Sequence, residues 1–246
     1  MVCMAITAAC ATSIAVPDCS PPTDHRRRLL PALARPSDAV AHLGPNWFAV
    51  VMGTGIVATA ATSLPRQLPG LRMFALVVWV LAATLLLVLL GATAAHWLRH
   101  PATARAHALH PVMSHFYGAP PMAILTVGAG ALLVGKDLVG LHTALAIDGV
   151  LWGVGTIIGL ASAVTIPYLA FTRHDYQPDA AFGGWLMPVV PPMVSATTGA
   201  LLVPYVGAGQ GRQTLLAACY AMFGLSLVAS LIVITLIWGR DRKSVV

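Results

Sequence analysis

The chain has 246 residues, of which 58% are hydrophobic and only 9% are charged, and its mean hydropathy is +0.81. Soluble domains carry about 25% charged residues, so this composition excludes a soluble globular fold. The net charge is +6, but no run of lysine and arginine is interleaved with aromatic residues, and we expect no nucleic-acid partner. The sequence therefore predicts a protein whose main solvent is the lipid bilayer.

Residues 1–45 form a proline-rich lead that contains the basic cluster 26–28. This composition predicts a disordered segment ahead of the membrane domain. A cleaved signal peptide and a misplaced start codon are the two alternatives. In a secretory signal the positive charge precedes the apolar core, whereas here it follows the apolar opening 1–16.

Six apolar stretches follow, each close to the roughly 20 residues that a helix needs to cross about 30 Å of hydrocarbon. They define a transmembrane domain over 46–239, with predicted spans at 47–64, 73–98, 112–134, 145–171, 182–206 and 215–238. The unbroken leucine and valine run 85–90 shows none of the alternation of a membrane β-strand. We therefore predict an all-α polytopic membrane protein.

Orientation is predicted from lysine and arginine, because cytoplasmic loops retain positive charge during insertion. The lead, the second and fourth loops and the tail carry ten of these residues, and the other loops carry four. Both termini are therefore expected in the cytoplasm.

The spans are of two kinds. The second and sixth are smooth and rich in leucine, valine and alanine, and we expect them to face lipid. The third and fifth contain the proline pairs Pro120-Pro121 and Pro191-Pro192. Such breaks are tolerated at membrane depth where protein or a water-filled cavity satisfies the freed carbonyls. The two broken helices therefore indicate a pathway for a solute through the protein. Packing alone is the alternative explanation for the many glycines and prolines.

Asp148 and His115 are the notable ionisable residues within the spans. A charge in hydrocarbon is costly, so each is a functional candidate. For Asp148 the alternatives are a solvated helix end or a bond to a neighbouring helix, and for His115 a hydrogen-bonded residue at the entrance of the third span.

No enzyme motif is present: GxSxG, HExxH, Walker A and paired carboxylates within a span are all missing. The four cysteines have no CxxC spacing and no histidine at metal-ligand spacing. We expect a protein that is not an enzyme and that holds neither a metal nor another cofactor.

Three stretches together resemble the tellurite-resistance and dicarboxylate transporter (TDT) family, which includes malate carriers, sulfite exporters and the slow anion channels of plant guard cells. They are PNWFAVVMGTG at 45–55, HFYGAPPMA at 115–123 and WLMPVVPP at 185–192. The resemblance covers about 45–238.

The resemblance implies a ten-helix fold of five hairpins, in which odd-numbered helices line a pore and even-numbered helices form an outer layer. It also implies a plasma-membrane transporter or channel for small anions, often a homotrimer, with C4-dicarboxylates such as malate as the leading substrate and sulfite or tellurite-related efflux as the alternative. A structural membrane subunit or a non-functional fragment is the alternative from another class. The residues expected along the pathway are Gly53, Thr54, Gly55, His115, Phe116, Pro120, Pro121, Asp148, Pro191, Pro192 and Ser195.

Only six of the ten helices are found, so the chain is expected to be truncated after the sixth. The tail 240–246 contains DRKSVV, which is also one reading frame of a common sequencing adapter. We interpret this tail as an assembly artefact.

Overall fold

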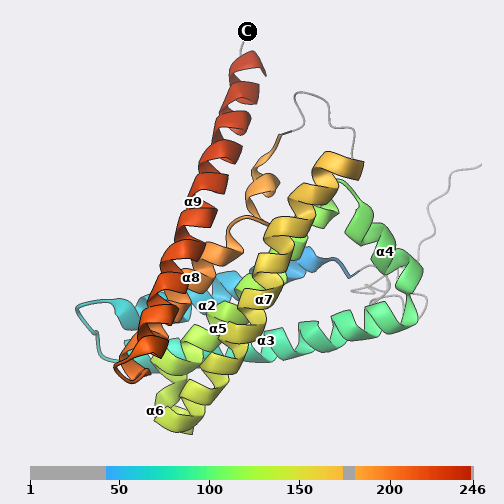
Figure 1. The fold of residues 1–246 in the computed structure, drawn as a ribbon. Coiled ribbons are helices and arrows are strands. Elements are labelled where there is room, and N and C mark those ends of the chain that lie inside the picture. The colour runs from blue at the N-terminus through green and yellow to red at the C-terminus, as the bar shows by residue number, and fades with distance from the viewer. Residues whose placement is uncertain (1–42, 174–180, 245–246) are drawn as a thin grey trace, which may run out of the picture. The chain divides into compact units, whose positions relative to one another are not determined.

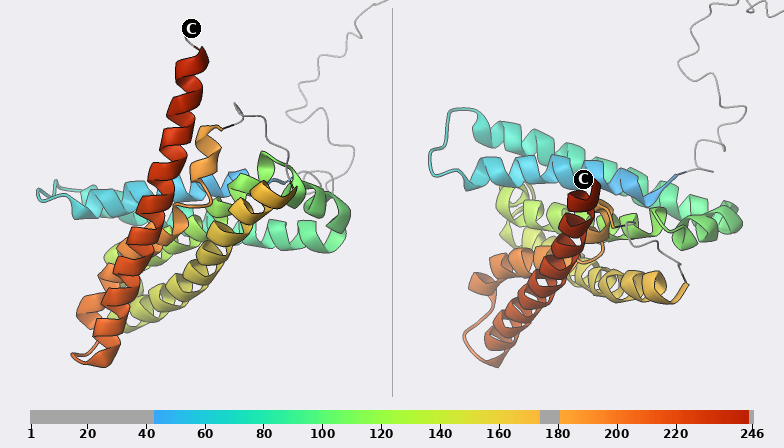
Figure 2. Two further views of the ribbon diagram at one scale, coloured as in Figure 1. Left: turned by 45° about the horizontal axis from the view of Figure 1, so that its top comes forward. Right: turned by 90° about the horizontal axis from the view of Figure 1, so that it is seen from above.

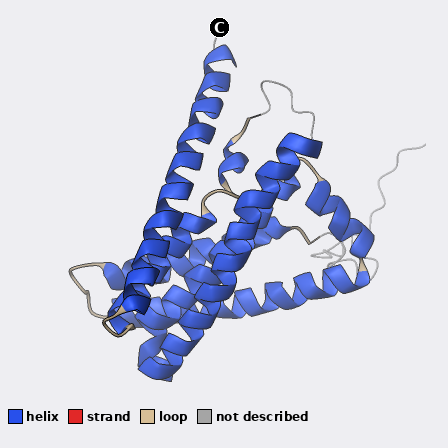
Figure 3. Cartoon of the chain, in the orientation of Figure 1, coloured by secondary structure: helices blue, strands red, loops and turns tan. Residues whose placement is uncertain are grey.

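The computed structural model describes residues 43–173 and 181–244, and this part of the chain is helical without any strand (Figure 3). The prediction of an all-α polytopic membrane protein is confirmed. The chain divides into two compact units, Met1–Ala34 and Arg35–Val246. The first unit, and with it nearly all of the predicted lead, lies outside the described residues.

The second unit consists of α-helices joined by short 3-10 and π segments. The α-helices are α2 (Phe48–Ser63), α3 (Leu71–Arg99), α4 (Pro101–Leu109), α5 (Ala119–Gly130), α6 (Lys136–Val139), α7 (Leu141–Arg173), α8 (Pro191–Leu202) and α9 (Gln210–Ser244). The short segments are η1 (Pro45–Trp47), η2 (Met113–Gly118), the π turn η3 (Ala131–Gly135), η4 (Gly183–Leu186) and η5 (Val203–Tyr205). Each predicted span overlaps one or more of these elements. The helix α4 was not predicted from the sequence.

Among the described residues, four helical stretches are long and apolar enough to cross a membrane: Leu71–Arg99, Met113–Val139, Leu141–Arg173 and Gln210–Arg240. The helices α2 and α8 are shorter, with 16 and 12 residues. At 1.5 Å per residue they extend about 24 Å and about 18 Å, less than a hydrocarbon core of about 30 Å. That the segments containing them also cross the bilayer stays a prediction.

The long helices pair with the shorter ones in chain order (Figures 1 and 2). α2 packs against α3, α5 against α7, and α8 against α9. α5 also packs against both α2 and α8. The stretch around α5 is mostly buried, whereas α3 and α9 are mostly exposed. The expected alternation of inner and outer helices therefore holds for α5 between α3 and α7, and α9 is an outer helix.

The proline pairs stand at breaks in the helical segments, as expected from the sequence, and not at kinks within continuous helices. Pro120-Pro121 lies in the first turn of α5, and Pro191-Pro192 begins α8. Proline is favoured there because the first amides of a helix have no partner within it and the fixed φ of proline suits the helix. Each helix is therefore broken before its proline pair, with the 3-10 segment η2 or η4 ahead of it.

Candidate functional site: a hydroxyl-lined cavity between three short helices

The starts of α5 and α8 meet against one glycine of α7. A Cβ atom built on Gly159 would lie 3.0 Å from the Cβ of Pro191 and 3.7 Å from the Cβ of Pro121. Pro121, Pro191 and Pro192 are fully buried, and Pro120 is partly exposed. The predicted prolines are thus brought together as a packed junction, and they do not line any of the cavities described below.

The segments ahead of these two helices also touch. A Cβ atom on Gly118, at the end of η2, would lie only 2.0 Å from the carbonyl oxygen of Met187, just after η4. No side chain fits between two backbones at this separation, so glycine is required at position 118.

A cavity of about 330 Å³ lies between α2, α5 with its π turn, and α8. Five of its lining residues carry hydroxyl groups, and none of the lining residues is charged. The hydroxyl residues are Thr59, Ser63, Thr126, Thr197 and Thr198, and the others are Met52, Ile56, Ala129, Leu133, Val194 and Leu201.

Each of these hydroxyls donates a hydrogen bond to a carbonyl of its own helix. Thr126 donates to Met122 at 2.7 Å, and Thr197 and Thr198 donate to Val194 at 2.9 Å and 2.8 Å. The hydroxyl oxygens keep lone pairs for a solute or for water. A hydroxyl that turns to donate to an anion gives up one such bond, which is worth about 1 kcal/mol.

The predicted residues of α2 lie beside this cavity and are not among its lining residues. Gly53 is exposed, with nothing within 4 Å of a built Cβ, and Thr54 donates to the carbonyl of Val50 at 2.8 Å. Gly55 is buried, and a Cβ atom there would lie 2.7 Å from Cγ2 of Thr126. Gly55 therefore sets how closely α2 approaches the wall of the cavity.

His115 is buried, with only 3% of it exposed. Its ring stacks on Trp185, with the ring centroids 6.0 Å apart. Both line a second cavity of about 350 Å³ whose other walls are apolar residues of α7 and α9 and the segment after η4. Phe116, next to it in η2, is partly buried and does not line this cavity.

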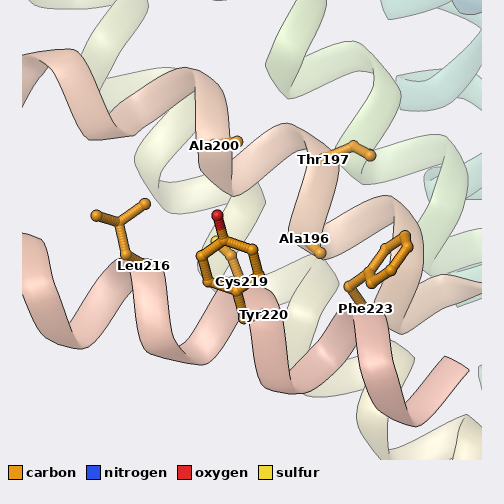
Figure 4. Close-up of a pocket in the computed structure, with 7 residues that line it drawn as sticks. All are labelled: Ala196, Thr197, Ala200, Leu216, Cys219, Tyr220 and Phe223. Carbon is orange, nitrogen blue, oxygen red and sulfur yellow. The ribbon is translucent and has the colours of Figure 1, made fainter. Parts of the chain in front are cut away.

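A third cavity, of about 290 Å³, lies between α8 and α9. Figure 4 shows side chains of α8 facing side chains of α9 across it. Its lining residues are Ala196, Thr197, Ala200, Leu216, Cys219, Tyr220 and Phe223. This lining is almost wholly apolar, which sets it apart from the hydroxyl-lined cavity.

Asp148 and Ser195 are both fully buried. Asp148 lies in α7 against Gly128 of α5, so the solvated helix end considered for it is wrong. Neither of its carboxylate oxygens, nor the hydroxyl of Ser195, has a hydrogen-bond partner among the described residues. The main-chain carbonyl of Ser195 accepts a 2.8 Å hydrogen bond from the indole of Trp152.

Three threonines of the inner wall, Thr126, Thr197 and Thr198, were not among the residues expected from the sequence. A signal for two of them is present, because Thr126 and Thr197 each follow the first proline of a pair by the same number of residues. In the part of the chain that the structure describes, no group of three or more His, Cys, Asp or Glu residues could hold a metal ion.

The sequence of this helical unit matches a family of known proteins. The family model described as voltage-dependent anion channel, SLAC1, matches residues 42–244. The chain belongs to this family. The resemblance to the TDT family is thereby confirmed, and with it the assignment to a family of membrane channels and transporters.

The curated relatives agree with this assignment to the SLAC1 family. A protein of Arthroderma otae named sulfite efflux pump is 27% identical over 202 residues, which are 82% of this chain and 54% of that protein. A protein of the same name from Trichophyton rubrum is 26% identical over 82% of this chain and 54% of its own length. An uncharacterized transporter of Methanocaldococcus jannaschii is 28% identical over 72% of this chain and 49% of its own length. The chain thus spans about half the length of the curated relatives that it matches.

Proposed function

We propose that this chain contributes to a membrane passage for small oxyanions, and that the cavity between α2, α5 and α8 is a section of that passage. The observation that carries the proposal is the set of five hydroxyl groups on a cavity formed by inner helices of an anion-channel family. Hydroxyl groups can replace part of the hydration shell of a solute without trapping it, as a fixed positive charge would.

Sulfite is the first candidate substrate, because two of the matched relatives are named sulfite efflux pumps. C4-dicarboxylates such as malate, which the resemblance alone put first, become the second candidate. A cavity of about 330 Å³ has room for either. Tellurite-related efflux has no further support.

The proposal includes an assembly and a location. We propose a multi-pass protein of the plasma membrane with both termini in the cytoplasm, and a homotrimer as its assembly. The excess of lysine and arginine in the lead, alternate loops and tail supports the orientation. Tags at each terminus, tested for accessibility in intact and permeabilised cells, check the orientation, and light scattering of the purified protein checks the assembly.

Flux of labelled sulfite and malate into proteoliposomes tests the function. Thr126→Val and Thr197→Val remove one hydroxyl each at nearly constant volume, and we expect sulfite flux to fall roughly fivefold in each, in line with about 1 kcal/mol per lost hydrogen bond. Thr84→Val is the matched control, because Thr84 is an exposed threonine of α3 that also donates to its own helix.

The flux assay uses the 246-residue chain and, in parallel, the product of the whole genomic reading frame. Unchanged flux in both cavity variants, with normal folding, would show that the passage runs elsewhere. Transport of malate but not sulfite would reverse the order of the two substrates.

A further inference from the structure

The hairpins α5/α7 and α8/α9 carry matching residues at a constant spacing along the chain. Pro191, Thr197 and Gly199 each lie 71 residues after Pro120, Thr126 and Gly128, respectively. Both prolines belong to the first turn of the inner helix, and both threonines line the same cavity. The two inner helices therefore present equivalent faces to equivalent neighbours.

The repeat extends to the contact between inner and outer helices. A Cβ atom on Gly128 would lie 2.9 Å from Oδ1 of Asp148, and one on Gly199 would lie 2.9 Å from Sγ of Cys219. Cys219 in turn lies 71 residues after Asp148. Asp148 and Cys219 thus occupy the same place in their hairpins.

The first hairpin has a looser contact between a glycine of its inner helix and a small side chain of its outer helix. A Cβ atom on Gly55 of α2 would lie 3.9 Å from the Cβ of Ala82 on α3, and Ala82 is fully buried. The site that the repeat defines is therefore filled by aspartate in one hairpin and by cysteine in the next. The packing at this site requires a small side chain and does not require a carboxyl group.

The carboxyl group of Asp148 is costly where it lies. The residue is fully buried, and neither oxygen has a hydrogen-bond partner in the described part of the chain. Burying an unpaired carboxylate costs several kcal/mol, so such groups bind a proton or a cation. A group that packing does not need and that is costly to bury points to a functional role.

Among the described residues, the elements that pack most closely against α7 bring no opposite charge to the level of Asp148. α5, η3 and α8, which pack against α7, contain no ionisable side chain. Two further elements that contact α7 are η2, with His115 and Tyr117, and α6, with Lys136 and Asp137.

These ionisable groups lie away from the carboxyl group. Asp148 is seven residues beyond the start of α7 at Leu141, or about 10 Å along the axis from the end that follows α6. His115 shares its cavity with Ile166 and Phe171, near the opposite end of α7. On α7 itself, His142 is exposed and lies nearly two turns before Asp148.

We propose that Asp148 is a proton-binding site coupled to the passage through α5. This rests on the proposed function for its coupling to anion flux, but not for the proton binding itself. The carboxylate takes one proton from solution and returns it to solution, with no other bond made or broken. In the protonated state the neutral carboxyl group packs against Gly128.

The helix α5 couples the proton-binding site to the cavity, because one of its faces contacts Asp148 and another lines the cavity. Gly128 contacts Asp148, while Thr126 and Ala129, on either side of it in sequence, line the cavity. An ionised carboxyl group needs water or another partner, which the tight contact with Gly128 excludes. Ionisation therefore separates α7 from α5 and shifts the wall of the cavity.

Infrared spectroscopy tests proton binding without any transport measurement. The difference between acidic and neutral samples of the reconstituted chain should contain the band of a protonated carboxyl group that Asp148→Asn removes. Asp137→Asn is the control, because Asp137 is an exposed aspartate paired with Arg72, and this variant should keep the band. A difference spectrum that is the same in the wild type and in Asp148→Asn would overturn the proposal.

Flux tests the coupling. Asp148→Asn mimics the protonated carboxyl group, and Asp148→Cys copies the equivalent site in the next hairpin. Flux is measured from about pH 5 to about pH 8, and the ratio of variant to wild-type flux is taken at each pH. This ratio cancels the change in flux that comes from titration of the substrate itself. We expect the Asp148→Asn variant to transport anions, at every pH tested, at the rate that the wild type shows at acidic pH.

The two assays separate the two proposals. A constant flux ratio across the pH range, in folded protein, would overturn the coupling. Failure of both variants to fold would show that the carboxyl group is structural, and would also overturn it. A protein that shows the infrared band but moves no anion would contradict the proposed function and leave the proton-binding site standing.

Discussion

The indole N–H of Trp79 on α3 donates a 3.1 Å hydrogen bond to the main-chain carbonyl of Val127 on α5. Two glycines make room for this ring, since a Cβ atom on Gly130 or Gly135 would lie 2.4 Å or 2.7 Å from it. Trp152 of α7 reaches the carbonyl of Ser195 on α8 in the same way, at 2.8 Å. In both cases a tryptophan of an outer helix fixes the inner helix of the next hairpin.

Trp79→Phe is expected to destabilise the protein by about 1 to 3 kcal/mol. The variant leaves the Val127 carbonyl without the indole donor and leaves a space beside Gly130 and Gly135. Thermal unfolding in detergent measures the change. Trp238→Phe is the matched control, because Trp238 is 69% exposed on α9 and should change stability by less than about 0.5 kcal/mol.

Gly118→Ala is expected to prevent folding, because the new methyl group would meet the Met187 carbonyl at 2.0 Å and neither backbone can yield. Gly53→Ala is the control, since nothing lies within 4 Å of its Cβ position, and alanine in a helix is favoured by about 1 kcal/mol over glycine. Yield and gel-filtration profile compare the two. A well-folded Gly118→Ala protein would contradict the close approach of η2 to the segment after η4.

Gly55→Val is expected to abolish anion flux while the chain still inserts in the membrane. Its side chain would push on Thr126, whose Cγ2 lies 2.7 Å from a Cβ atom at position 55, and so displace the wall of the cavity. Flux into proteoliposomes, with Gly53→Val as the control, measures this. Normal flux in a folded Gly55→Val protein would remove Gly55 from the residues that shape the passage.

Cysteine scanning along α5 is expected to give a stripe of water-accessible positions. Cysteines at 126, 129 and 133, which line the cavity, should react with a membrane-impermeant thiol reagent. A cysteine that replaces Val127, which packs in the buried cluster with Phe48 and Val51, should be protected. The native cysteines are first replaced by serine or alanine. Protection at all four positions would favour packing over a passage.

Some features of the candidate site were predictable because they depend on local sequence. The composition requires a bilayer, and long apolar runs without alternation require helices, since every backbone group must be satisfied within the segment. The breaks before α5 and α8 follow from proline, which has no amide hydrogen and suits only the first turn of a helix. These properties of residues and their immediate neighbours can be deduced from one sequence.

The tertiary structure decided which side chains face which neighbour. Thr126 and Thr197 line a cavity, while Gly53 and Thr54 do not. Asp148, about two turns from the start of its helix, is fully buried against Gly128. Hydropathy could not have revealed this, because inner and outer faces of these helices are almost equally apolar and the amphipathic signal of a soluble helix is missing. The facing of each residue is set by contacts between helices far apart in sequence, where glycines such as Gly118 and Gly128 let backbones approach.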